Sequence, residues 1–386
     1  MGRAREGRRN AGGPRVVQAE QERSPERNEH KGREEHQRGR EERDTDEERA
    51  DAARRRSLHR WRIVAAIRDE RVRPRTTHSV TVHQTAQVLQ GQASDVGLAH
   101  TGDGLDLRTY RWPTPGAVRA HVLLVHGVAE HAGRYQHVAS RLASAGFETH
   151  AFDLRGFGGS SGHRAYVDGW SQYHDDLEGR LAEVRSAAGE LPVVLYGHSM
   201  GGLIALGYVL ADPPRPLPDL LVLSAPALDA VVPAWKRGLA GILAVAVPRF
   251  AIANTFPKGA LSSDPAVESA YLADPLAVHR TTARLGVALL REQDRVRSAL
   301  ADRGPLPVAT YVLHGAEDPL VPERASRSLD GRANVTRRVY PGLHHETHNE
   351  PSGAAVIDET IAWIARHIGA DSRGATRTEG AQASPR

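Results

Sequence analysis

The chain has 386 residues, a formal net charge of +4 and no cysteine, so disulfides and thiolate metal sites are excluded. The positive excess lies in the first 80 residues, which carry 22 basic and 16 acidic side chains, so the rest has no basic surplus that would predict nucleic-acid binding. No run of about 18 apolar residues predicts a transmembrane helix, and no apolar stretch near the start predicts a secretory signal. We therefore expect a cytoplasmic protein.

The first 90 residues are rich in arginine and glutamate and contain few large apolar side chains. Such a segment cannot bury enough surface to offset the entropy of ordering. We therefore predict a disordered extension over residues 1–90 and a second disordered tail over 371–386. An electrostatic tether to anionic lipid or nucleic acid is the alternative for the extension, but the acidic residues interleaved with its arginines weaken that alternative.

Between these ends, residues 91–370 alternate short apolar runs with helical patterns. The predicted strands cover 122–125, 147–152, 193–196, 220–223, 308–313 and 338–340. Among them VLLV at 122–125 is a fully apolar run, which is typical of a buried parallel strand. The helical patterns cover 134–145, 171–185, 200–210 and 354–368. This alternation predicts an α/β fold with a mostly parallel central sheet flanked by helices.

One region, residues 227–303, breaks the alternation because it has no convincing strand. We predict that it is a helical cap inserted over the carboxyl edge of the sheet, where open α/β sheets place their sites. Its apolar stretch at 239–247, LAGILAVAV, is too short to span a bilayer. That stretch predicts either a buried helix or a lipid-facing part of the cap, and the second option would give peripheral membrane contact.

A candidate nucleophile lies in Gly-His-Ser-Met-Gly at 197–201, which matches G-x-S-x-G. The motif alone is weak, but here a predicted strand precedes it and a predicted helix follows it. A serine on such a turn is exposed at the sheet edge, at a helix N-terminus that favours developing negative charge. We therefore predict that Ser199 is the nucleophile of a serine hydrolase.

A serine hydroxyl needs an imidazole to take its proton and a carboxylate to orient that imidazole, and in this fold class the chain order is Ser, acid, His. Glu317 and Asp318 both follow the strand predicted at 308–313. We favour Asp318, because the Pro-Leu-Val after it is typical of the turn that exposes the acid.

Three histidines compete for the base: His344, His345 and His348. His344 and His348 are four residues apart and offer metal binding as an alternative, but H-E-x-x-H is not formed and no acidic ligand cluster supports zinc. We expect neither metal nor cofactor. Other histidines have no placement that demands a role, among them His121, His137, His150 and His163.

Five segments in chain order resemble the monoacylglycerol lipases and their lysophospholipase-like relatives, the serine aminopeptidase S33 group of α/β-hydrolases. They are HGVAEHAGRY (126–135), DLRGFGGSSG (153–162), GHSMGG (197–202), HGAEDPLV (314–321) and GLHHETHNE (342–350). The resemblance spans residues 94–370 and implies an α/β-hydrolase fold. Two positions depart from the family pattern: Ala129 replaces a glycine after the oxyanion residue, and Phe157 replaces a histidine.

The resemblance also implies roles for individual residues. It identifies His345 as the base and places the oxyanion hole at the backbone N–H groups of Val128 and Met200. It further implies that the polar end of the pocket, which holds glycerol, is formed by Glu130, Arg134, His198 and His348.

The function implied is hydrolysis of monoacylglycerol to glycerol and a fatty acid through an acyl-enzyme on Ser199. A lysophospholipase and a general short-chain carboxylesterase are the alternatives within the enzyme class. A peptidase is less favoured, a dehalogenase would need Asp in place of Ser199, and a non-catalytic binding module would be expected to lack a triad member. The sequence gives no indication of oligomeric state.

Overall fold

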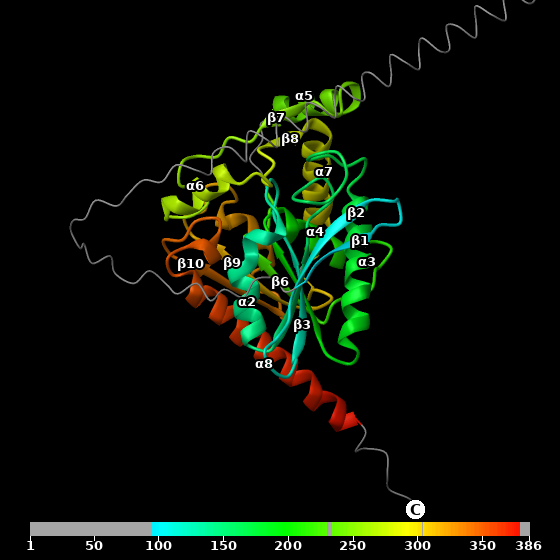
Figure 1. Cartoon of the computed structure of the whole chain (residues 1–386), viewed down its shortest axis with the longest axis vertical. Helices are drawn as coiled ribbons and strands as arrows, with labels where there is room; N and C mark the ends of the chain where they lie inside the picture. The colour runs from blue at the N-terminus through cyan, green and yellow to red at the C-terminus, as the bar shows by residue number, and fades with distance from the viewer. Residues whose placement is uncertain (1–94, 230–233, 303, 379–386) are drawn as a thin grey trace, which may run out of the picture. The chain divides into compact units, whose positions relative to one another are not determined.

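The computed structural model describes residues 95–229, 234–302 and 304–378, so the extension predicted at 1–90 lies outside the described residues. Eight strands of the described part form one sheet in the order β1-β2-β4-β3-β5-β6-β9-β10 (Figure 1). The strands are β1 (Asp95–His100), β2 (Asp106–Trp112), β3 (Ala120–Val125), β4 (Phe147–Phe152), β5 (Val193–His198), β6 (Leu220–Ser224), β9 (Ala309–Gly315) and β10 (Val335–Tyr340).

The sheet is parallel from β4 to β10, while β2 pairs antiparallel with β4, and β1 with β2. The prediction of a mostly parallel sheet is confirmed. Strands β1 and β2 were not predicted, because DVGLAH and DLRTYRW contain no apolar run. They form the edge of the sheet, where one side of the pairing is open and β1 stays largely exposed.

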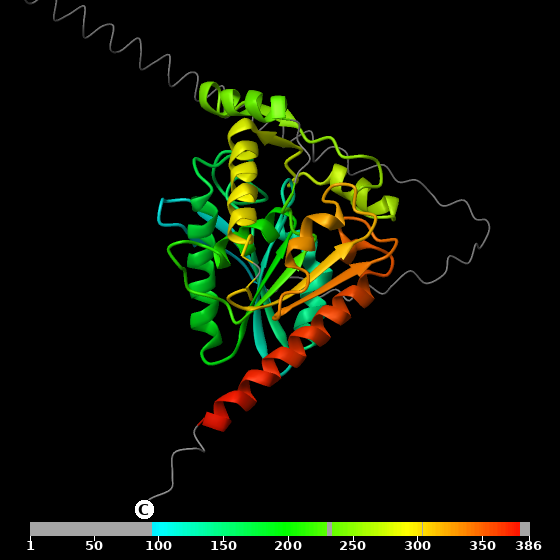
Figure 2. The ribbon, with the colours of Figure 1, turned by 180° about the vertical axis from the view of Figure 1, so that it is seen from behind.

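Helices cover both faces of the sheet (Figures 1 and 2). Along β3, Leu123 and Val125 pack into a core with helices α3 and α4, whereas Val122 and Leu124 pack into a second core with α2 and α8. This alternation follows from the two-residue period of a strand. The helices are α2 (Gln136–Ser144), α3 (Ser171–Ala188), α4 (Met200–Val209) and α8 (Gly353–Thr378), with short 3-10 turns η1 (Ala132–Tyr135), η2 (Glu323–Leu329) and η3 (Thr347–Asn349).

Helix α8 continues to Thr378, past residue 370, where we expected the domain to end and a disordered tail to begin. Its repeat of apolar residues ends near Ile368, so periodicity alone predicted an earlier end. Among the described residues, no helix is both long and apolar enough to cross a bilayer.

The region predicted as a helical cap contains α5 (Ala234–Ala246), α6 (Pro265–Ala273) and α7 (Ala283–Ala299). It also contains two strands, β7 (Ala251–Ala253) and β8 (Arg280–Thr282), which pair antiparallel. The expectation that this region has no strand was therefore wrong. Each strand has three residues, too few to show a two-residue period in the sequence.

Loops that leave the carboxyl ends of the sheet strands hold the cap in place. The Val278 N–H donates to the Ala129 carbonyl after β3, and the Thr282 hydroxyl donates to the Ala165 carbonyl after β4. The Glu346 N–H after β10 donates to the Leu261 carbonyl. The cap is thus seated on the edge of the sheet where the predicted catalytic segments lie.

Candidate active site

Ser199 lies on a sharp turn between β5 and α4, with φ 52° and ψ −117°. Positive φ is unfavourable for a residue with a Cβ, and such strain is common at functional sites. The turn requires its glycines: a Cβ on Gly197 would lie 2.5 Å from the Gly201 carbonyl oxygen, and one on Gly201 would lie 2.2 Å from that of Val125. The sequence therefore folds into a turn that presents the Ser199 side chain at the sheet edge.

His345 and Asp318 form a buried pair beside this turn. Nδ1 of His345 lies 2.7 Å from Oδ2 of Asp318, and the other carboxylate oxygen accepts from the backbone N–H groups of Leu320 and Val321 at 2.8 and 2.9 Å. With Asp318 accepting at Nδ1, the imidazole keeps Nε2 as the free base nitrogen.

The pair shifts the proton affinity of both members. Burial is the largest single effect on His345 and opposes its charged form, but the carboxylates of Asp318, Glu346 and Glu130 together outweigh burial and raise the pKa of the imidazole. Burial also works against the Asp318 carboxylate, yet the His345 charge and hydrogen bonds from His314 and His345 hold its pKa well below the ordinary value. A base of raised pKa next to a permanently ionised acid is the arrangement that proton transfer from serine requires.

The structure separates His345 and Asp318 from their rivals. Glu317 is exposed, and His344 points its Nδ1 at Glu350, 3.0 Å away. Ser199 and His345 line the same cavity, although between these described residues no hydrogen bond joins the hydroxyl to the imidazole. Such contacts are often loose in an enzyme without substrate and tighten when it binds.

The loop after β3 brings a second set of groups to Ser199. Val128 lines the cavity, Met200 begins α4, and within the described chain neither backbone N–H has an acceptor. Both donors are thus available to a developing oxyanion. Ala129 stands where the family pattern has a glycine. It takes φ 68° and is fully buried, and a glycine would adopt this positive φ without strain. The loop therefore has a glycine-like backbone at this alanine.

Glu130 holds this loop from inside the protein. Its Oε1 accepts from the Gly127 N–H at 2.6 Å and from the Tyr135 hydroxyl at 2.7 Å, and its Oε2 pairs with Arg134. Arg134 in turn donates two bonds, of 2.7 and 2.8 Å, to Glu346. Glu130, Arg134 and Glu346 therefore form a buried ion cluster on the cavity wall.

The structure places three of the four predicted substrate-binding residues on the cavity wall: Glu130, Arg134 and His198. His348 does not line it. It is buried behind the wall, with its ring stacked on Tyr135 and close to that of His198. Glu346 was missed by the sequence analysis, although a carboxylate next to the predicted base was a signal for it.

The cavity has a volume of about 200 Å³. Its polar lining comprises the ion cluster, His198, the candidates Ser199 and His345, and also Asp229 and Gln293. Its apolar lining comes from the cap and from the loop after β9, with Ala227, Phe256, Leu261, Leu289, Leu320 and Val321. A larger cavity of about 920 Å³ between α3 and α7 contains none of the three catalytic candidates, so volume alone does not mark the site.

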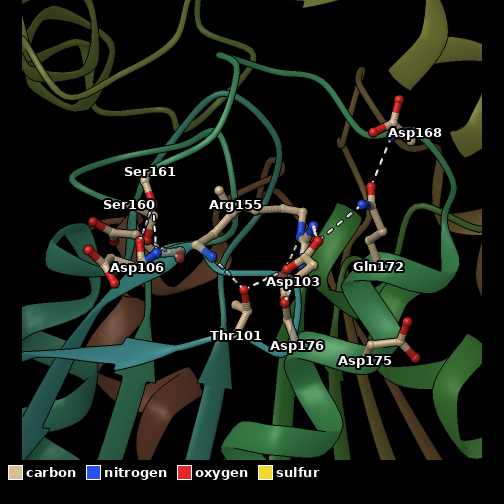
Figure 3. A network of polar contacts seen from close by, with 12 residues as sticks. Thr101, Asp103, Asp106, Arg155, Ser160, Ser161, Asp168, Gln172, Asp175 and Asp176 are labelled. Atoms are coloured by element: carbon tan, nitrogen blue, oxygen red, sulfur yellow. Dashed lines mark hydrogen bonds and ion pairs between the residues drawn. The ribbon is translucent and has the colours of Figure 1, made fainter.

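The loop after β4 is hydrogen-bonded to the segment that follows the oxyanion loop. The Asp153 carboxylate accepts from the Ala132 N–H at 2.8 Å, next to the oxyanion loop. Farther along, buried Arg155 bridges Asp176 on α3 and Asp103 in the β1–β2 turn (Figure 3). Phe157 is buried against the His126 ring. The motif residues at 153–162 thus fix a loop and do not reach the cavity.

Comparison with known proteins shows the family of the chain. Residues 116–352 match the family model described as serine aminopeptidase, S33. A monoacylglycerol lipase of Mycolicibacterium smegmatis is 37% identical over 265 residues, which cover 67% of this chain and 92% of that one. Phospholipase YtpA of Bacillus subtilis is 28% identical over 266 residues, which cover 67% of this chain and 99% of YtpA.

Among solved structures, the monoacylglycerol lipase of Paleococcus ferrophilus superposes with a TM-score of 0.59 at 27% identity, covering 68% of this chain and 99% of that one. The family match covers more than half of the chain, and the solved structure shares its fold. The chain belongs to the serine aminopeptidase S33 family of α/β-hydrolases.

Proposed function

We propose that this protein is a carboxylic ester hydrolase that cleaves monoacylglycerol into glycerol and a fatty acid. The observation that carries the proposal is the His345–Asp318 pair, whose imidazole lines the same cavity as Ser199, among both polar and apolar side chains. The monoacylglycerol lipase names of two relatives support the substrate class.

In the proposed reaction, the Ser199 hydroxyl attacks the ester carbonyl while Nε2 of His345 takes its proton. Asp318 stabilises the imidazolium, and the N–H groups of Val128 and Met200 bind the oxyanion, where each donor contributes about 3–4 kcal/mol. His345 then protonates the departing glycerol oxygen. Water, deprotonated by the same histidine, releases the fatty acid from Ser199.

The cavity divides the substrate between its polar and its apolar lining. The apolar wall provided by the cap fits an acyl chain, and the ion cluster of Glu130, Arg134 and Glu346 with His198 fits a polyol. Glu130 and Arg134 already bond within the protein, so we infer that they orient hydroxyl groups through their remaining lone pairs and N–H bonds.

Hydrolysis of p-nitrophenyl butyrate by the wild type and by Ser199→Ala tests the nucleophile. We expect the variant to lose about 10⁶-fold in kcat with an unchanged melting temperature. Equal activity of the two proteins would refute the proposal. Monoolein, lysophosphatidylcholine and tributyrin then test the substrate, and monoolein must have the highest kcat/KM.

A short-chain carboxylesterase is the second candidate, because the cavity volume of about 200 Å³ lies below the range of roughly 300–1,000 Å³ usual for ligand pockets. A series of p-nitrophenyl esters from acetate to palmitate separates the two. A maximum at butyrate, with little activity on monoolein, would favour the short-chain enzyme.

We also propose that the cap contacts lipid. On α5, Leu239, Ile242 and Val245 recur every three residues and are 49%, 66% and 78% exposed, which forms one apolar helix face. Val247, Phe250 and Ile252 continue this exposed apolar surface. Burial in the acyl boundary of a bilayer would remove it from water.

The double variant Ile242→Asp, Val245→Asp tests this contact. We expect at least tenfold weaker cosedimentation with phosphatidylcholine vesicles and unchanged turnover of soluble p-nitrophenyl butyrate. Leu98→Asp, which alters an equally exposed residue on β1, is the matched control and should bind vesicles like the wild type. Equal vesicle binding by all three proteins would contradict the proposal.

A further inference from the structure

A second cluster of metal-ligating side chains lies at the opposite edge of the sheet from Ser199. His121 is near the start of β3, and Glu148 and His150 are near the start of β4. The cluster lies about 20 Å along β3 from the oxyanion loop, at a rise of roughly 3.3 Å per residue. Sequence analysis assigned these histidines no role, and nothing in the proposed reaction uses them.

Strand register brings the three side chains together. His121 pairs with Glu148 across the parallel β3–β4 ladder. His150 follows Glu148 by two residues and therefore points to the same face of the sheet. On the next strand, Arg111 of β2 is the antiparallel partner of His150. Three adjacent strands thus place two imidazoles, a carboxylate and a guanidinium on one face.

The distances between the ligand atoms are those of a metal site. Nδ1 of His121 lies 3.1 Å from Nε2 of His150, and Oε1 of Glu148 lies 3.4 Å from the latter and 3.8 Å from the former. Bonds of about 2.0–2.2 Å to a tetrahedral ion place its ligand atoms roughly 3.3–3.6 Å apart. The three measured separations bracket that value, so an ion fits between the atoms after small side-chain shifts.

The surroundings match those of a bound cation. All three side chains are at least nine-tenths buried. Arg111 donates to both oxygens of Glu148, at 2.9 and 3.2 Å. Such outer hydrogen bonds orient ligating carboxylates in metal proteins.

Room for further ligands adjoins the cluster. A cavity of about 430 Å³ is lined by the three side chains and by Arg111, Arg180 and Glu183. Arg180 is paired with Glu183, and Arg111 with Glu148. Water in this cavity would complete a coordination shell.

We propose that His121, Glu148 and His150 bind a divalent first-row transition ion such as Zn²⁺. Two imidazole nitrogens favour such an ion over Ca²⁺ or Mg²⁺, which prefer ligands that are all oxygen. The ion joins β3 to β4 at the edge remote from the catalytic pair, so it acts on the stability of the fold. The proposal does not depend on the substrate of Ser199.

The first test titrates the full-length protein, freed of metal by a chelator, with Co²⁺. We expect the visible ligand-field bands of bound Co²⁺ to saturate at one equivalent and Zn²⁺ to displace them. Zn²⁺ should also raise the melting temperature, because it binds the folded state. His121→Gln and His150→Gln should each weaken Co²⁺ binding at least tenfold and abolish the Zn²⁺-dependent rise.

His163→Gln is the matched control. His163 is an exposed histidine outside the cluster, and this variant should bind Co²⁺ like the wild type, with every other histidine of the chain in place. Failure of the wild type to show saturable bands, or equal bands in the control and in the two cluster variants, would overturn the proposal.

A second measurement covers the case in which the cluster variants do not fold. X-ray absorption of the wild-type protein loaded with one equivalent of Zn²⁺ should show two imidazoles and oxygen ligands at about 2.0–2.1 Å. A shell of oxygen alone, or one with a single imidazole or with three or more, would assign the ion to another place and refute this site.

Discussion

Two buried histidine–carboxylate groups lie at opposite edges of one sheet, and they differ in what else the carboxylate contacts. Asp318 at the carboxyl edge accepts from His345 and from backbone N–H groups, and among the described residues no arginine pairs with it. Glu148 at the amino edge receives two hydrogen bonds from Arg111.

The pKa values of the histidines differ accordingly. Burial lowers the pKa of His345, but the charge and hydrogen bond of Asp318, together with the charges of Glu346 and Glu130, raise it above the ordinary value. Burial lowers the pKa of His150 to about 4, because Glu148 offsets it only in part and His121 and Arg111 add to the fall. Nearby carboxylates together outweigh burial at His345, whereas at His150 the one carboxylate is outweighed by burial, His121 and two arginines. The same residue types thus give a candidate general base at one edge and candidate metal ligands at the other.

The largest expected effect is a fall in kcat on removal of the Asp318 charge, with which no arginine of the described residues pairs. Asp318→Asn keeps the shape of the side chain but loses the charge that stabilises the His345 imidazolium and fixes its tautomer. We expect kcat for p-nitrophenyl butyrate to fall by about 10⁴-fold. Glu317→Gln changes the adjacent, exposed carboxylate and should retain wild-type kcat. Similar losses in both variants would show that Asp318 has no special role.

The next effect concerns carboxylates that do depend on an arginine. Arg134→Met leaves Glu130 and Glu346 buried without their cation, which should lower the free energy of unfolding by about 3–5 kcal/mol. Arg141→Met breaks an exposed pair with Asp358, and such pairs contribute about 0–1 kcal/mol. Urea denaturation measures both variants, and equal losses would contradict the distinction between buried and exposed pairs.

The sequence predicted the parts of the fold that carry apolar runs. Strands β3, β4, β5, β6, β9 and β10 were all expected. Strands β3, β5 and β6 contain apolar runs, as buried parallel strands do, whereas β4 carries Glu148, Thr149 and His150 and β10 carries two arginines. Strands β1 and β2 and the three-residue strands of the cap lack apolar runs. β1 and β2 form a local hairpin, whereas β2 pairs with β4 and β7 with β8, partners distant in sequence that periodicity does not report.

For the candidate site, chain order and local motifs identified Ser199 and Asp318, while the family resemblance was needed to choose His345. Neither the motifs nor the family resemblance predicts the direction in which a side chain points. Glu346, on the cavity wall, is bonded by Arg134, which is 212 residues away in the sequence. The register that joins His121 to Glu148 is likewise visible only once β3 and β4 are paired.

The smallest of the three effects is the pH dependence that the raised pKa of His345 implies. The imidazole must be neutral to take the Ser199 proton, so kcat/KM should fall about tenfold per pH unit below that pKa. Because Asp318 raises the pKa, the midpoint should lie above the ordinary value of 6.5. In Asp318→Asn the effect of burial remains without the opposing carboxylate, so the residual activity should have its midpoint at lower pH than the wild type. The pH profile of p-nitrophenyl butyrate hydrolysis measures both midpoints, and a variant midpoint at or above that of the wild type would mean that another group sets the basicity of His345.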